Sequence, residues 1–323
     1  MTEKILARAS GRDFVRPGDD IEARPDFVIS YDFPGYTDVF FREAREEFGV
    51  DKVDRPERFV LFIDHMVPAA APKEEELHRI TRDWGAKQGV PVHERKGIGH
   101  QVSAELGYAV PGAFVVHFDG HVSQLGAFGT YAFGARKGVL EAYVSPTLAL
   151  TVPPTVKIVI TGSLQPGVMA RDVFHHLVRV MGPSSCAFKA VELAGPVIEA
   201  MSIEGRQTIC GQAMFLGANT MLIAPDQRTL DYVRGRAKLD LVPVHPDADA
   251  VYERVVTVDV SDLQPIVVVP PSPANTRDLT EHLGVEVHTG YLGSCASGRL
   301  EDLRAAAAVL RGRQIKPGFQ LHV

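Results

Sequence analysis

The stretch VEVHTGYLGSCASGRLEDLRAAAAVL, residues 285–310, decides the fold class of this chain. It begins with strand-forming residues over 285–291 and continues through a turn rich in glycine and serine over 293–298. Apolar residues then recur at spacings of three and four, which predicts a helix. A strand that ends abruptly in a polar turn and leads into a helix is the repeating unit of α/β proteins. The stretch therefore predicts an α/β fold.

The same unit occurs twice earlier in the chain. Apolar runs over residues 59–63 and 113–118 each end in a polar cluster, and the first is followed by a helix expected over residues 74–88. The polar residues that follow these two runs are Asp64, His65, Asp119 and His121. Ligands of open α/β sheets bind beyond the carboxyl ends of the strands. We therefore expect these residues to line one cleft together with His100 and Cys295.

The chain is expected to divide into three α/β domains. The first covers residues 1–155, the second 156–270, and the third begins within 271–323. A proline-rich segment over 265–273 is interpreted as the linker between the last two. The third domain is short for an independent unit and is expected to be incomplete. A strand is predicted over 319–323, at its end.

Charge and hydropathy exclude some classes of partner. The formal net charge is -6 and the sequence pI is about 6.1, so nucleic acid and anionic membranes are poor electrostatic partners. No apolar run reaches membrane-spanning length, and residues 1–12 carry charges without a hydrophobic signal core. We expect a cytoplasmic protein with a small-molecule substrate.

The three cysteines are far apart and odd in number, which argues against a disulfide framework. Cys295 lies in a glycine-rich turn before a helix, where backbone N–H groups favour a thiolate or a bound anion. Cys186 and Cys210 are predicted to be buried, as free cysteines commonly are.

Three imidazoles and two carboxylates are the candidates for chemistry. His65, His100 and His121 with Asp64 and Asp119 could bind a metal ion, or could bind and protonate a polar substrate. Each histidine taken alone could equally hydrogen-bond the end of a strand. Both interpretations stay open on the residues alone.

Seven phrases of the sequence occur together and in order. They are EKILARA (3–9), IDH (63–65), GHQV (99–102), GSLQPGV (162–168), TIC (208–210), GSC (293–295) and GRLEDL (298–303). In this combination the chain resembles the aconitase superfamily, and within it the large, catalytic subunits of 3-isopropylmalate dehydratase and homoaconitase.

The resemblance implies aconitase-like three-layer α/β domains around a central cleft, a 4Fe-4S cluster and a separate small subunit with a swivelling domain. The implied reaction is the reversible dehydration of a 2-hydroxy di- or tricarboxylic acid. The implied catalytic residues are Asp64, His65, His100, Asp119 and His121. The implied substrate-binding residues are Ser294, Ser297 and Arg299, and the implied metal ligand is Cys295. Arg299 and Asp302 could instead brace the turn.

The sequence departs from the family motifs at several positions. Gly120 and Val122 stand where the family has Ser and Thr, and Ala296 and Ser297 replace Thr and Asn. At the TIC motif an asparagine is replaced by glycine, at position 211. A catalytic glutamate is replaced by Phe215, which we expect to pack against apolar neighbours beside the cleft. General acid-base groups of this kind contribute ~100-fold to 10,000-fold in rate.

Two further cluster cysteines of the family lie in a Cys-x-x-Cys segment downstream of Val323. We therefore expect no complete cubane in these 323 residues, and at most one divalent metal ion. The function predicted is a hydro-lyase of the aconitase type. The alternative is a repurposed or catalytically degenerate protein of the same fold without a 4Fe-4S cluster, which uses a mononuclear metal or serves in assembly or regulation. A thiol enzyme centred on Cys295 lacks a nearby second cysteine.

Overall fold

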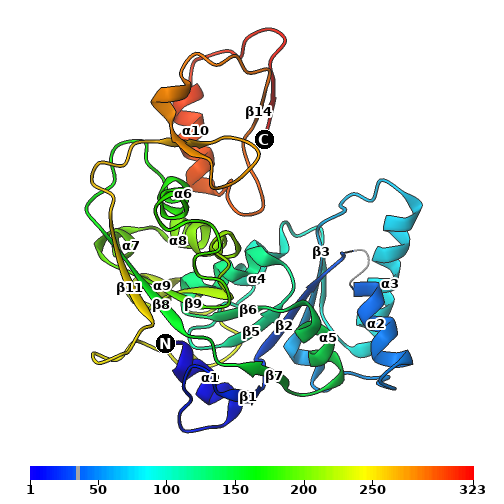
Figure 1. Ribbon diagram of the computed structural model, residues 1–323. Helices are drawn as coiled ribbons and strands as arrows, with labels where there is room; N and C mark the ends of the chain where they lie inside the picture. Colours follow the sequence, from blue (N-terminus) through cyan, green and yellow to red (C-terminus); the bar gives the residue numbers. More distant parts are fainter. Residues whose placement is uncertain (34–36) are drawn as a thin grey trace.

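The computed structural model describes residues 1–33 and 37–323 and is built on two parallel sheets (Figure 1). The first sheet has the strand order β4-β3-β2-β5-β6. Its strands are β2 (Phe27–Tyr31), β3 (Phe59–Ile63), β4 (Val92–Glu94), β5 (Phe114–His117) and β6 (Tyr131–Gly134). Every residue of β2, β3 and β5 is buried. Strands covered on both faces appear in the sequence as continuous apolar runs, which is why β3 and β5 were predictable.

Helices surround this first sheet. They are α1 (Thr2–Ser10), α2 (Thr37–Glu46), α3 (Pro72–Gln88), α4 (Gly99–Glu105) and α5 (Arg136–Val144), with the 3-10 helices η1 (Pro56–Arg58) and η2 (Gly120–Phe128). A separate antiparallel pair joins β1 (Asp20–Ala23) to β7 (Leu148–Thr151). The helix predicted over residues 74–88 is α3, which begins two residues earlier because Pro72 occupies its first turn.

The second sheet has the order β10-β9-β8-β11 and is also parallel. Its strands are β8 (Thr155–Thr161), β9 (Ala190–Ala194), β10 (Thr220–Ile223) and β11 (Arg254–Asp259). Its helices are α6 (Ala170–Met181), α7 (Pro196–Ala200), α8 (Ile203–Cys210), α9 (Gln227–Val233) and the 3-10 helix η3 (Ala213–Leu216). Helix η2 contacts both β6 and β10, so it joins the two sheets. One hydrophobic core contains residues of both. The boundary near residue 155 stays a prediction.

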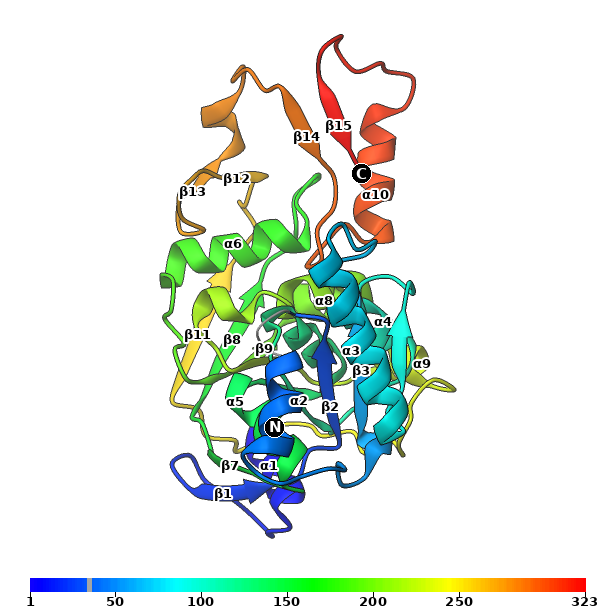
Figure 2. The same cartoon turned by 90° about the vertical axis from the view of Figure 1, so that its right-hand side faces the viewer.

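The remaining elements lie beyond the second sheet, at the top of Figure 1 and in the orange and red part of Figure 2. They are β12 (Ile266–Val268), β13 (Thr276–Asp278), η4 (Leu279–His282), β14 (Thr289–Tyr291), α10 (Leu300–Leu310) and β15 (Gln320–His322). β12 pairs antiparallel with β13, and β14 pairs parallel with β15. No residue of α10 is buried. No helix among the described residues combines the length and apolar character needed to cross a membrane.

Two expectations for this region need correction. The segment expected to be a linker, residues 265–273, contains strand β12 and the turn that leads to β13. The strand expected over 285–291 forms only at 289–291, and Val285 and Val287 are 62% and 64% exposed. β15 is paired with Thr289 through Tyr291 only, so the preceding residues have no partner strand among those described.

Candidate active site

The ends of neighbouring parallel strands bring His65 and Asp119 together. His65 follows β3 and Asp119 follows β5, and both strands point the same way in the first sheet. His65 Nε2 lies 3.4 Å from Asp119 Oδ2, and His65 Nδ1 lies 2.7 Å from Asp64 Oδ1. The imidazole is therefore placed between two carboxylates, one on each ring nitrogen. The side chains of Asp64 and Asp119 are both largely buried.

A third carboxylate, Asp32, supports the same loop and was missed by the sequence analysis. It follows β2 and its side chain is fully buried. Asp32 Oδ1 accepts hydrogen bonds from the backbone N–H groups of Asp64 and His65, at 2.9 and 3.0 Å. His78 Nε2 lies 3.0 Å from Asp32 Oδ2. The signal was present in the sequence, because Asp32 directly follows an apolar run, as Asp64 does.

The carboxylates keep His65 protonated. Burial disfavours the charged imidazolium, but hydrogen bonds to Asp119, Asp32 and Asp64 outweigh it and raise the pKa of His65 to about 12. Burial likewise opposes ionisation of Asp119, yet hydrogen bonds from His121 and His65 hold the pKa of that carboxyl well below its usual range. At neutral pH the pair is an imidazolium and a carboxylate.

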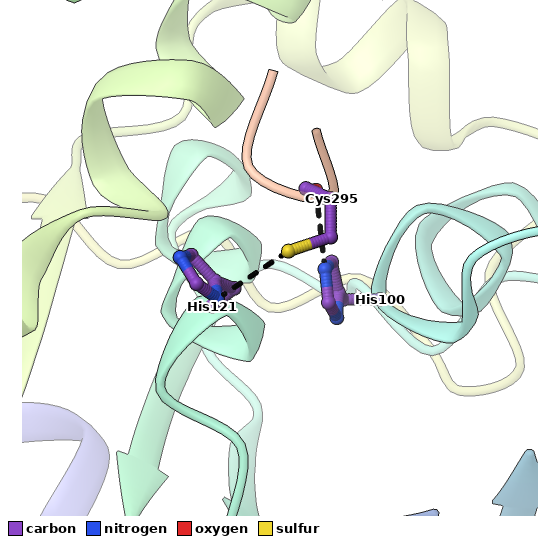
Figure 3. A group of neighbouring side chains, drawn as sticks. All are labelled: His100, His121 and Cys295. Atoms are coloured by element: carbon purple, nitrogen blue, oxygen red, sulfur yellow. Dashed lines mark hydrogen bonds between the residues drawn. The ribbon is translucent and has the colours of Figure 1, made fainter. Parts of the chain in front are cut away.

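Cys295, His121 and His100 form a second group beside the first (Figure 3). Cys295 Sγ lies 3.7 Å from His121 Nδ1, and His100 Nε2 lies 3.1 Å from the Cys295 backbone oxygen. His121 Nδ1 is also 3.6 Å from Asp119 Oδ1, so Asp119 links the two groups. His100 is buried, because α4 packs against η2, whereas Cys295 is exposed on the loop over residues 293–298.

This second group carries a thiolate and a charged imidazole at neutral pH. Hydrogen bonds from His100 and His121 lower the pKa of the Cys295 thiol to about 6, against the opposing effect of burial. Burial lowers the pKa of His121, but Asp119 and Cys295 outweigh it and raise the pKa to about 9. An exposed cysteine with a depressed pKa is suited to bind metal or to react as a nucleophile.

Tyr31 is a further residue that the sequence analysis missed. Its ring centroid lies 5.4 Å from that of His65 and 6.1 Å from that of His100. The ring is fully buried, and its hydroxyl has no hydrogen-bond partner among the described residues. Burial and the nearby Asp119 carboxylate raise the pKa of Tyr31 well above its usual value, so the hydroxyl keeps its proton. In the sequence, Tyr31 is distinguished only by its place at the end of an apolar run.

Of the three predicted substrate-binding residues, Arg299 is the most enclosed. Its side chain is buried, and its guanidinium donates to oxygens of four residues: Gln101, Gln124, Gln207 and Thr208. The bracing interpretation fits these contacts, because α4, η2 and α8 are all tied to the loop that carries Cys295. Ser297 accepts a 2.7 Å hydrogen bond from Arg171, and Ser294 Oγ lies 3.5 Å from Ser297 Oγ.

Two cavities share the loop over residues 293–298 as a wall. Their volumes are about 800 and 670 Å³. Cys295 and Arg299 line the smaller one, and Ser297 lines both. The predicted catalytic histidines His65, His100 and His121 line neither cavity. Six side chains were expected to line one cleft: Asp64, His65, His100, Asp119, His121 and Cys295. They lie together in one cluster, and the cleft itself stays a prediction.

A family model described as the aconitase family (aconitate hydratase) matches residues 3–286. The chain belongs to the aconitase family. It is 38% identical, over its whole length, to the 3-isopropylmalate dehydratase large subunit 1 of Methanopyrus kandleri, of which it covers 77%. It is 36% identical to the probable methanogen homoaconitase large subunit of Methanothermobacter thermautotrophicus, over 98% of this chain and 74% of that protein. It is 34% identical to the 3-isopropylmalate dehydratase large subunit of Halothermothrix orenii, over 98% of this chain and 75% of that protein. These similarities favour the predicted hydro-lyase over the repurposed or degenerate alternative.

Phe215, which stands where the aconitase-family motif has glutamate, is half-buried as expected for an aromatic side chain. Its ring centroid lies 6.2 Å from that of Phe174, and it lines the larger cavity. Gly211, at the asparagine position, has no room for a larger side chain without movement, since an added Cβ would meet the Gln207 carbonyl oxygen at 3.0 Å.

The aconitase family implies a 4Fe-4S cluster, which is held by several cysteine thiolates. Among the described residues Cys295 is the one cysteine at the site, because Cys186 and Cys210 are buried in the hydrophobic core. Burial also raises the pKa of both thiols, which disfavours the thiolate that a ligand must be. The described residues fit one ligand position of such a cluster and do not complete it.

Proposed function

We propose that this chain is the large subunit of a hydro-lyase that reversibly dehydrates a 2-hydroxy di- or tricarboxylic acid, in association with a small subunit. The observation that carries the proposal is the protonated His65 between Asp64 and Asp119 at the ends of parallel strands. Membership of the aconitase family and relatives named as dehydratase and homoaconitase large subunits support it.

In this proposal His65 supplies a proton to the leaving hydroxyl group. Dehydration breaks a C–O bond and the C–H bond of the neighbouring carbon. The departing oxygen must gain a proton to leave as water, and the proton of the C–H bond must pass to a base at the same site. A group of pKa about 12 can protonate hydroxide, whose conjugate acid water has a pKa of 15.7. Asp64 and Asp119 fix the orientation of the ring and stabilise its charge until the proton is transferred.

The candidate metal ligands are His100, His121 and Cys295. Their ligand atoms all lie within 4.8 Å of one another. Two imidazoles and a thiolate suit a borderline-soft divalent ion, and three protein ligands leave a coordination position open. Such a mononuclear site and a cluster that uses Cys295 are mutually exclusive. Anaerobic analysis of iron, zinc and sulfide in the purified protein distinguishes them, because only the cluster contains sulfide.

The function is tested by turnover. The protein is purified anaerobically and incubated with 3-isopropylmalate, homocitrate or citrate, with and without the small subunit of an isopropylmalate dehydratase, and the unsaturated acid is followed by ultraviolet absorbance. Asp119→Asn keeps the shape of the side chain but removes its charge, and we expect it to reduce kcat ~100-fold to 10,000-fold. Asp83→Asn changes an exposed carboxylate on α3 and is the matched control. Absence of turnover for every acid, in folded protein loaded with metal, would contradict the proposal.

A further inference from the structure

His78 is the one histidine of α3 and lies on the buried face of that helix. The buried residues of α3 follow one another at helical spacing: Leu77, His78, Thr81, Gly85 and Gln88. The helix contacts β3 and β4 of the first sheet (Figure 2). The approach is close, because a Cβ added at Gly85 would clash with the Val92 side chain. α3 therefore holds His78 at a fixed place relative to the sheet.

The imidazole of His78 contacts the carboxylate of Asp32. Its Nε2 lies 3.0 Å from Asp32 Oδ2, and no Lys or Arg among the described residues forms an ion pair with Asp32. Burial raises the pKa of Asp32, but hydrogen bonds from His65 and from backbone N–H groups outweigh it and lower the pKa. The carboxyl is therefore ionised at neutral pH and can only accept hydrogen bonds. It follows that His78 Nε2 is the donor.

Asp32 connects His78 to the loop that carries His65. Asp32 Oδ1 accepts hydrogen bonds from the backbone N–H groups of Asp64 and His65, at 2.9 and 3.0 Å. Asp32 Oδ2 accepts one from the backbone N–H group of Met66, at 3.3 Å. His78 and Met66 therefore share one oxygen. Because His78 holds that oxygen from the side of α3, it fixes the plane of the carboxylate, and the three backbone N–H groups follow that plane.

The same carboxylate also lies beside the ring of His65. Asp32 Oδ1 is 3.6 Å from His65 Nδ1, whose nearer neighbour is Asp64 Oδ1, and Asp119 lies on the Nε2 side of the ring. These three carboxylates are the charged groups around the ring. The side chain of Asp32 is 0% exposed, against 6% for Asp64 and 13% for Asp119, so Asp32 is the one shielded from solvent most completely.

A histidine on the buried face of a helix is most often a packed core residue. That role alone requires only an acceptor for the ring N–H group. Here the acceptor is a carboxylate whose other hydrogen bonds, among the described residues, all come from the backbone of residues 64–66. A change at His78 therefore acts on one loop of the candidate site and not on the core in general.

We propose that His78 is a positioning residue, which orients Asp32 and thereby fixes the loop over residues 64–66 and the direction in which His65 presents its proton. The inference rests on the proposed function for the use of that proton. The placement of the His65 ring is a property of the folded chain and is measurable without a substrate.

The test compares variants at two positions on the same face of α3. His78→Leu removes the donor, and His78→Gln restores one, because a glutamine Nε2 reaches nearly the position of a histidine Nε2. Asp32→Asn removes the charge that the donors bind. Thr81→Val is the matched control, because Thr81 is also fully buried and its hydroxyl donates only to the backbone oxygen of Leu77, within the helix.

NMR of protein with isotopically labelled histidine, at pH 8, detects the two ring N–H protons of His65, which are assigned with His65→Gln. Both signals are seen only while each proton is hydrogen-bonded and exchanges slowly with water. We expect both in the unaltered protein, in His78→Gln and in Thr81→Val, and we expect their loss in His78→Leu and Asp32→Asn. In turnover, His78→Leu should lower kcat roughly tenfold to a hundredfold with little change in KM, because small displacements of a catalytic group have effects of that size.

Ring signals that persist in folded His78→Leu protein would overturn this inference. Their loss in Thr81→Val, or their absence from His78→Gln, would do the same. Folding of each variant is checked by circular dichroism and thermal unfolding. If His78→Leu does not fold, His78→Asn carries the test, because its shorter polar side chain does not reach Asp32. Absence of turnover in the unaltered protein contradicts the proposed function alone, whereas unchanged ring signals and unchanged kcat in His78→Leu contradict the role of His78 alone.

Discussion

His65 Nε2 lies 3.4 Å from Asp119 Oδ2, although 54 residues separate the two in the sequence and each follows a different strand. The contact exists because β3 and β5 both flank β2 in parallel, so that their carboxyl ends reach the same edge of the sheet. The pair combines a buried negative charge with an imidazolium that keeps its proton across the neutral range.

The first prediction concerns pH and this pair. The folded-state pKa of His65, about 12, is above the ordinary histidine pKa of 6.5, so its contribution to the free energy of unfolding is fully present below pH 6.5 and is lost as pH rises toward 12. Asp119→Asn removes part of that contribution. The loss in free energy of unfolding, measured with urea, should therefore be larger at pH 6 than at pH 9. An equal loss at both values would show that His65 is not held protonated by Asp119.

The second prediction is selective alkylation of Cys295. With its pKa lowered to about 6 by His100 and His121, the metal-free protein should react with iodoacetamide at a rate that rises with a midpoint near pH 6. His121→Ala removes one hydrogen-bond donor and should move the midpoint upward. Buried Cys186 and Cys210 are internal controls that should stay unmodified in the native protein. Mass spectrometry reports all three, and a rate that rises only above pH 8 would refute the prediction.

The third prediction concerns the buried guanidinium of Arg299. Arg299→Met leaves the side-chain oxygens of Gln101 and Gln124 without a donor, and we expect the free energy of unfolding to fall by about 3 kcal/mol. Arg299→Lys should restore only part of the lost free energy of unfolding, because a lysine ammonium cannot donate to several acceptors in one plane. Arg304→Met, on the exposed side of α10, is the matched control and should have little effect. Urea unfolding monitored by circular dichroism measures all three.

The fourth prediction concerns Arg206, which is 1% exposed and pairs with Asp226 at 2.5 Å. Asp226→Asn keeps the hydrogen bond that caps α9 but leaves the guanidinium without its counter-charge. We expect a loss of roughly 2 kcal/mol, less than for a fully buried pair because Asp226 is 40% exposed. Hydrogen bonds from Arg206 and Thr229 outweigh burial and lower the pKa of Asp226 to about 2. The contribution of the pair is therefore present above pH 3.8 and should disappear as pH falls toward 2.

The fold and the close approach of the candidate acid-base residues were predictable where a local pattern determines them. Strands β3 and β5 are apolar runs, and the polar residues after them had to meet at one edge because parallel strands point the same way. The contacts of Arg299 were not predictable, because its acceptors lie on α4, η2 and α8 and no spacing in the sequence relates them. Val285 resembles a strand residue, but a strand also requires a partner, which composition does not reveal.

The two parts of the site are attached to elements that differ greatly in burial. The imidazole of His65 and the carboxylate of Asp119 extend from buried strands of the first sheet, whereas the thiol of Cys295 is carried on a loop whose following helix, α10, buries none of its residues. A rotation of the segment that contains α10 would move the Cys295 sulfur and Ser297 together and would leave His65 where it is. The position of the thiol therefore depends on the contacts of Arg299 with Gln101 and Gln124, whereas that of His65 depends on the buried strands of the first sheet.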